Sequence, residues 1–186
     1  MIKRIINSDV FKMVTALAAV GIISAVSLSF IYSYSMPKIT ENMNKATQEG
    51  IKNIFPEAGE ITKTSMEGVS EVKDKDGKAL GYAFVSVGNG YQGPIKIIAG
   101  VDPGINTMIG IEILESQETP GLGAEIAGVF RKQFSGLSVV GDITYVKNKK
   151  PEKLGEIEAI TGATISSRAV VNILNGKINE IKKTLK

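Results

Sequence analysis

Residues Thr161 to Ser167 place small and hydroxyl-bearing side chains where the strand-like run Ile157–Ile160 meets a helical pattern. Gly162 permits a tight turn there, which puts Thr164 in the first turn of the helix. Backbone N–H groups in a first turn have no intrahelical partners, and the helix dipole is positive at that end. The pattern therefore suits a bound phosphate. The residues that leave room or add donors around Thr164 are Thr161, Gly162, Ala163, Ser166, Ser167 and Arg168.

The same residues also have an ordinary structural interpretation, because threonine and serine at a helix start are common N-caps. Taken alone, the local pattern favours that interpretation. Thr161-Gly162-Ala163-Thr164, however, resembles the Ser/Thr-Gly-Ala-Thr signature of covalent FMN-binding domains. The resemblance implies that FMN is joined through its phosphate to Thr164, and that a dedicated flavin transferase makes the phosphoester bond.

A second motif supports this resemblance. Glu118 to Gly123 is similar to the Glu-Thr-Pro-Gly-Leu-Gly run of the same domains, which implies a loop against the flavin formed by Glu118, Thr119, Gly121, Leu122 and Gly123. Glu118 is expected to be an exposed or backbone-capping residue, and no catalytic acid or base is expected. Leu122 is expected to cover the isoalloxazine, and its alternative role is to fill the domain core from a turn. A third stretch, from Gly93 to Asp102, also resembles the family, so the likeness covers residues ~68 to 175 in order.

The composition narrows the possible chemistry. The chain has 186 residues with no cysteine and no histidine. Protein-held iron–sulfur clusters and ordinary zinc or haem sites are therefore excluded, as is catalysis by a Ser-His-Asp or Cys-His set. Redox chemistry would need an organic cofactor. Outside the first 38 residues, acidic and basic residues balance at 18 of each, so we expect no nucleic-acid partner.

Residues 13–37 contain no charged side chain and form the predicted transmembrane helix. A helix of that length reaches ~37 Å, against a hydrocarbon core of ~30 Å. A cleaved signal peptide is the alternative, but its apolar core would be shorter. Lys3, Arg4 and Lys12 precede the span, which predicts a cytoplasmic N-terminus at residues 1–12. The expected location is the cell (inner) membrane, with a single pass and the FMN domain on the extracytoplasmic side.

The remaining chain is predicted to comprise a helical linker, residues 38–67, and an FMN-binding domain, residues 68–186. The fold class is α+β, with a mainly antiparallel sheet and flanking helices. The pattern predicts helices at 39–55, 124–133 and 164–185, and strands at 68–73, 79–87, 95–101, 108–114 and 143–146. Asp76-Gly77 is typical of a hairpin turn.

Within the family, the compact length and the run Thr161 to Val171 resemble the G subunit of the Rnf ion-translocating ferredoxin:NAD⁺ oxidoreductase. This implies an electron-carrying subunit that has no turnover alone. It also implies partner subunits of the A, D and E types, with an iron–sulfur centre as electron donor and a second flavin subunit as acceptor. Two alternatives are the C subunit of the Na⁺-translocating NADH:quinone reductase and a stand-alone extracytoplasmic flavin protein. A non-redox binding module is a third and would contain no flavin.

The charge distribution makes one prediction about topology. Because the basic residues precede the span, the chain after Pro37 should lie outside the cytoplasm, and protease added to intact spheroplasts should digest it. Detergent-permeabilised spheroplasts serve as the control, since digestion occurs there in either orientation. Full protection in the intact spheroplasts would reverse the predicted topology.

Overall fold

The computed structural model describes residues 9–185, which divide into two units, one up to Asn44 and one from Lys45 onward. The first unit consists of most of α2, Asp9–Ile54, a 46-residue helix whose most apolar window has a mean hydropathy of 2.2. None of that window is buried against other parts of the described chain, and the helix is long and apolar enough to cross a membrane. Pro37, the expected end of the span, lies inside α2, and the helix continues beyond it.

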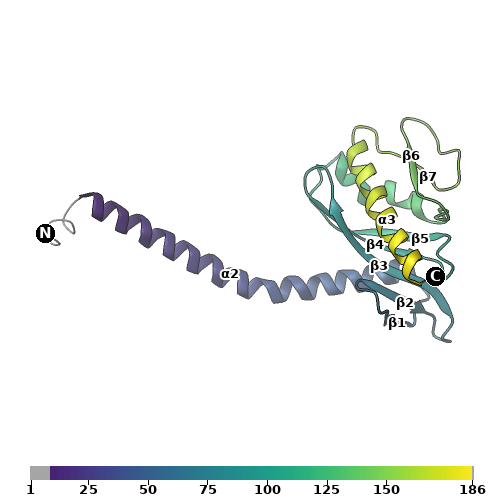
Figure 1. Ribbon diagram of the computed structural model, residues 1–186, viewed down its shortest axis with the longest axis horizontal. Coiled ribbons are helices and arrows are strands. Elements are labelled where there is room, and N and C mark those ends of the chain that lie inside the picture. Colours follow the sequence, from purple (N-terminus) through teal and green to yellow (C-terminus); the bar gives the residue numbers. More distant parts are fainter. Residues whose placement is uncertain (1–8, 186) are drawn as a thin grey trace. The chain divides into compact units, whose positions relative to one another are not determined.

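The second unit is built on an antiparallel sheet with the strand order β1-β2-β3-β4-β5 (Figure 1). The strands are β1 Glu60–Lys63, β2 Val69–Lys73, β3 Ala79–Asn89, β4 Pro94–Val101 and β5 Met108–Ser116. Neighbours in sequence are neighbours in the sheet, so each connection is a hairpin or a short loop. The predicted α+β class with a mainly antiparallel sheet is confirmed.

The predicted helical linker, residues 38–67, differs from the structure in its second half. There, β1 pairs with β2 from Glu60↔Lys73 to Lys63↔Ser70. Every residue of β1 is exposed, and its sequence, Glu-Ile-Thr-Lys, contains a single apolar residue. No alternation of apolar and polar residues therefore marks it as a strand. Ile51, Ile54 and Phe55, at and just after the end of α2, are buried against the sheet and belong to its core.

The sheet is covered on both faces. One core cluster contains Ile51, Ile54 and Phe55 together with Val72, Ala83 and Ile98. The other face of the sheet contributes Phe84, Ile95, Ile97, Ala99 and Val101 to the larger cluster, where α3, Thr164–Leu185, supplies Val170, Leu174, Ile178 and Ile181. The predicted apolar face of this helix is therefore the buried one. Gly88 of β3 has no room for a side chain because Ile173 of α3 packs against it.

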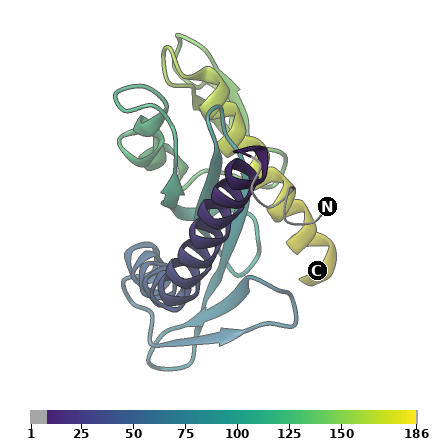
Figure 2. The ribbon, with the colours of Figure 1, turned by 90° about the vertical axis from the view of Figure 1, so that its left-hand side faces the viewer.

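The segment between the sheet and α3 corrects one prediction. Residues 124–133 were expected to form one amphipathic helix, but they form two 3₁₀ turns, η1 Gly123–Ala127 and η2 Phe130–Phe134, next to the sheet (Figure 2). The apolar spacing is nevertheless used, because Ile126, Phe130 and Phe134 are all buried. Gly128 lies between the two turns, and glycine is a poor helix former, which accounts for the break.

A small second sheet precedes α3. Its strands, β6 Thr144–Val146 and β7 Glu156–Glu158, pair in parallel with Thr144 opposite Glu156. Asn175 of α3 fixes this sheet to the helix, because its side chain donates to the Ile143 carbonyl and accepts from the Ile143 N–H. The chain therefore enters the start of α3 from a supported strand.

Candidate functional site

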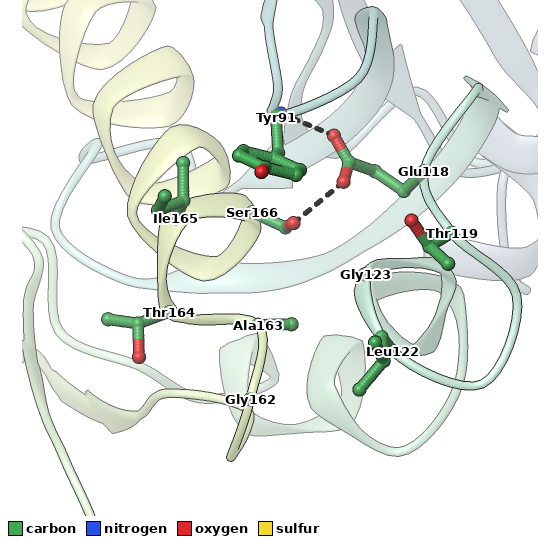
Figure 3. A pocket seen from close by; sticks show the side chains of 10 residues that line it. All are labelled: Tyr91, Glu118, Thr119, Leu122, Gly123, Gly162, Ala163, Thr164, Ile165 and Ser166. Atoms are coloured by element: carbon green, nitrogen blue, oxygen red, sulfur yellow. Dashed lines mark hydrogen bonds between the residues drawn. The ribbon is translucent and has the colours of Figure 1, made fainter.

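The first turn of α3 forms part of the wall of a cavity of about 460 Å³ (Figure 3). Three segments distant in sequence line it. The tip of the β3–β4 hairpin contributes Tyr91, and the loop after β5 contributes Glu118, Thr119, Leu122 and Gly123. The start of α3 contributes Gly162, Ala163, Thr164, Ile165 and Ser166. A cavity of this size and mixed lining is typical of a small-molecule or cofactor site.

The turn before α3 depends on Gly162, whose φ of +81° is in the left-handed region. The N–H of Ala163 donates to the Ile160 carbonyl, and the N–H of Ser167 makes the first helical bond, to Ala163 O at 3.0 Å. The N–H groups of residues 164–166, which come before that bond, therefore point out of the helix start without an intrahelical acceptor. This geometry provides the phosphate-binding helix terminus that the sequence predicts.

The hydroxyl groups of the motif differ sharply in accessibility. Ser166 is 2% exposed and donates to Glu118, whereas Ser167 is fully buried, donates to Ala163 O and accepts from the Ile160 N–H. Thr164 is only partly buried, and no hydrogen bond among the described residues engages its hydroxyl. Thr161 is exposed and donates weakly to Asn148 at 3.4 Å, outside the cavity. Thr164 is thus the motif hydroxyl that is both free and in the cavity wall.

Glu118 is the one charged side chain in the cavity lining, and it is only 6% exposed. Its carboxylate accepts the backbone N–H of Tyr91 at 2.5 Å and that of Gln92 at 3.3 Å. It also accepts the Ser166 hydroxyl at 2.8 Å (Figure 3). The backbone-capping alternative for Glu118 thus describes the structure, and the exposed alternative does not.

The structure brings most of the predicted site residues together and leaves a few apart. Thr161, Gly121 and Arg168 are exposed and do not line the cavity, and Ser167 has a structural role under the first turn. Two further lining residues, Tyr91 and Ile165, were not predicted from the sequence. Ile165 lay inside the quoted motif, and the indication for Tyr91 was an aromatic residue at a hairpin tip between Gly90 and Gly93.

Each of the three segments that line the cavity also contributes one large apolar side chain. Tyr91, Leu122 and Ile165 line the cavity while remaining 65%, 47% and 46% exposed, respectively. Leu122 is therefore not part of the domain core, which removes its alternative role. Exposed large apolar side chains around one cavity are typical of a site for a flat apolar ligand. Within residues 9–185 no group of His, Cys, Asp or Glu side chains could hold a metal ion.

The comparison with protein families defines the class of this site. Residues 90–179 match the FMN-binding domain family. The matched range includes the hairpin tip, the Glu118 loop and the first turn of α3, which are the three walls of the cavity.

The whole chain has relatives among the subunits of membrane complexes. It is 30% identical to the G subunit of the Na⁺-translocating ferredoxin:NAD⁺ oxidoreductase complex of Acetobacterium woodii, over 91% of this chain and 90% of the relative. It is 27% identical to the G subunit of the ion-translocating oxidoreductase complex of Methanosarcina acetivorans, over 94% and 96% of the two chains. The chain belongs to this family of G subunits. The helix α2 and this membership together indicate that it is anchored in a membrane.

A solved structure shares the fold. The crystal structure of NqrC from Shewanella oneidensis superposes with a TM-score of 0.56 at 20% identity, over 70% of this chain and 74% of that chain. The similarity shows a common fold.

FMN fits the site that the described residues form. The unengaged hydroxyl of Thr164 and the free N–H groups of the first turn suit a phosphate, and the apolar side chains suit a planar ring system. The carboxylate of Glu118 is held away from Thr164 by Ser166 and Tyr91, so its charge does not occupy the phosphate end.

The turn at Gly162 leads to a matched pair of substitutions. Gly162→Ala should lower the free energy of unfolding by about 1–2 kcal/mol, because alanine is strained at a φ of +81° and its Cβ would lie 3.2 Å from Leu122. Gly176→Ala, in the middle of α3 with open space around it, should instead leave stability unchanged or raise it by up to about 1 kcal/mol. Urea unfolding of the full chain in detergent, followed by circular dichroism, measures both. Equal effects of the two substitutions would contradict the role given to Gly162.

Proposed function

We propose that the protein is the G-type electron-carrying subunit of an ion-translocating ferredoxin:NAD⁺ oxidoreductase complex, and that it carries FMN joined through a phosphoester bond to Thr164. The proposal rests first on family membership. The two relatives described above are named as G subunits of ion-translocating oxidoreductase complexes, and both match almost the whole chain. The quinone-reductase alternative has only the shared fold in its favour.

One observation carries the assignment of Thr164 as the attachment residue. Of the hydroxyl groups in the motif, only that of Thr164 lines the cavity without a protein hydrogen-bond partner among the described residues. Ser166 and Ser167 are buried, and their hydroxyl groups are engaged. A flavin transferase would need access to the hydroxyl that it esterifies, which favours Thr164 over the two serines.

The N-terminus of α3 is well placed to stabilise the product of this reaction. A phosphodiester on Thr164 carries a negative charge beside the free N–H groups of the first turn and the positive end of the helix dipole. Gly162 and Ala163 supply no bulky side chain on the approach to the threonine. The chain therefore holds the cofactor at its phosphate end and leaves the ring system against Tyr91, Leu122 and Ile165.

FMN supplies the redox chemistry, since the sequence contains no cysteine or histidine to hold an iron–sulfur cluster or haem. Electrons are expected to arrive from an iron–sulfur centre held between partner membrane subunits. They are expected to leave for a second flavin on the D-type subunit. The covalent bond prevents loss of the cofactor on the extracytoplasmic side, where we place the domain because of the charges that precede the span.

The attachment is tested by Thr164→Ala, which removes the oxygen to be esterified while keeping a good helix former in the first turn. Flavin fluorescence of the protein band on a denaturing gel should disappear. The mass of the intact chain should fall to that of the polypeptide alone, whereas the parent chain should exceed it by one FMN less one water. Thr184→Ala, the same substitution in the last turn of α3, is the control and should retain the full flavin band. An undiminished band in Thr164→Ala would place the attachment elsewhere, with the exposed Thr161 as the next candidate.

The apolar wall is tested by Leu122→Ser. Because Leu122 is 47% exposed, this change should alter the free energy of unfolding by less than about 1 kcal/mol. It should, however, shift the flavin absorption bands and midpoint potential, since the ring loses an apolar cover, and it should leave the cofactor covalently bound. Val129→Ser, a change at an exposed apolar residue outside the cavity, should shift neither quantity. An unchanged spectrum and potential in Leu122→Ser would show that the leucine does not contact the flavin.

A further inference from the structure

We propose that Glu118 is a positioning residue that joins the three walls of the cavity and thereby sets its shape. The proposal deepens the function proposed above, and its effect on the flavin rests on that function. The contacts of the Glu118 carboxylate with the β3–β4 hairpin and with α3 do not themselves require a flavin.

The two carboxylate oxygens bind different segments. Oε1 accepts the N–H groups of Tyr91 and Gln92 at the hairpin tip, at 2.5 and 3.3 Å. Oε2 accepts the hydroxyl of Ser166, in the first turn of α3, at 2.8 Å. Glu118 itself belongs to the third segment, the loop after β5, where the Ser116 hydroxyl accepts its own N–H at 3.2 Å. A single side chain therefore bridges three segments that are far apart in the sequence.

The surroundings are shaped to admit this carboxylate. A Cβ on Gly90 would collide with Oε1, and a Cβ on Gly123 would lie 2.5 Å from Oε2 and 2.7 Å from the Ser166 oxygen. Glycine at these two positions thus leaves room for both carboxylate oxygens. Neither glycine has a positive φ, so close approach is the requirement at these positions; Glu118 makes it at both, together with Ile95 at Gly90 and Ser166 at Gly123.

The energetics also indicate a specific role. Burying a carboxylate is costly unless hydrogen bonds and nearby charge compensate it, and a well-packed apolar residue is often at least as stabilising. None of the ion pairs among the described residues includes Glu118. Its compensation comes from the two backbone N–H groups and the Ser166 hydroxyl. These groups belong to the hairpin tip and to α3, so the buried carboxylate is stabilised only when both segments lie against the Glu118 loop.

The consequence is that one residue sets the distances between the apolar wall and the attachment residue. Each of these residues moves with its own segment. Tyr91 belongs to the hairpin tip, Leu122 to the Glu118 loop, and Thr164 and Ile165 to the first turn of α3. Apart from the bonds to Glu118, the hairpin tip is tied to the loop by the exposed bond from Gln92 Nε2 to Thr119 Oγ1, at 2.7 Å. Loss of the carboxylate should therefore release Tyr91 from the rest of the site.

The first experiment needs no flavin. In full-length chain with Thr164→Ala, hydrogen exchange is measured at the Tyr91 and Gln92 amides and in the first turn of α3. Glu118→Ala should speed exchange at both hairpin amides by about tenfold, because each loses a hydrogen bond to a charged group. Glu118→Gln should stay within about threefold of the parent, since its carbonyl can accept the same N–H groups and its amide can donate to Ser166. Glu115→Ala, a change at an exposed glutamate of β5, is the matched control and should have no effect.

Ser166→Ala removes only the hydrogen bond between Glu118 and α3, so it separates that bond from the bonds to the hairpin tip. It also provides a test if Glu118→Ala fails to fold. It should speed exchange in the first turn of α3 and leave the hairpin amides within about threefold of the parent, because Oε1 keeps its partners. Unchanged exchange at the hairpin in Glu118→Ala would overturn the proposal. So would equal effects of Glu118→Gln and Glu118→Ala, because charge rather than hydrogen-bond geometry would then hold the walls.

The second experiment uses the chain with Thr164 intact and its flavin bound. Glu118→Ala should lower the fluorescence anisotropy of the flavin and weaken its visible circular dichroism, since the ring loses a fixed wall. Glu118→Gln should preserve both signals, and Glu115→Ala should do the same. A chain without flavin would contradict the proposed function but leave the exchange result intact. Normal flavin signals in Glu118→Ala would contradict the positioning role of Glu118 and leave the proposed function intact.

Discussion

The burial of one face of α3 on the sheet is the interaction on which the site depends. Leu174, Ile178 and Ile181 place the helix against the side chains of β3 and β4, and Gly88 lets it approach closely enough for Ile173 to pack on the backbone. Such apolar burial is non-directional, yet the close packing of a core fixes where the helix begins. The start of α3 is consequently presented at one end of the sheet, where the hairpin tip and the loop after β5 also lie.

Polar contacts then convert this general placement into a cavity of defined shape. The positive φ of Gly162 turns the chain into the helix, and the buried Ser167 closes that turn through bonds to both Ile160 and Ala163. Glu118 holds the opposite walls. Only the hydroxyl of Thr164 is left partly accessible in the cavity wall, in the region of the helix where a phosphate is most stable. Structural and cofactor roles are therefore divided among neighbouring hydroxyl groups of one motif.

Helix α2 consists of two parts that differ in composition. An uncharged run of 25 residues has no buried partner in the described chain, and a lipid environment would satisfy it. The last turns of α2 behave differently, since Ile51 and Ile54 enter the core of the sheet domain. One continuous helix thus contains a segment suited to lipid and a segment that completes a soluble core. This division agrees with the membrane anchoring that α2 and the family membership indicate.

Features that depend on local pattern could be predicted from the amino-acid sequence. Period-2 and period-3.6 spacing of apolar residues located α3 and strands β2 to β5, and the absence of charge between Lys12 and Lys38 located the span. Two short motifs identified the family and most of the cavity wall. The remaining features depend on contacts between residues that are distant in the chain, so they became apparent only in the folded protein. The strand β1, for example, has no buried residue to mark it. Other features arise where three separate segments meet, and no local pattern encodes that meeting. They are the burial of Glu118, the contribution of Tyr91 to the cavity, and the different accessibility of the hydroxyl groups of Thr164, Ser166 and Ser167.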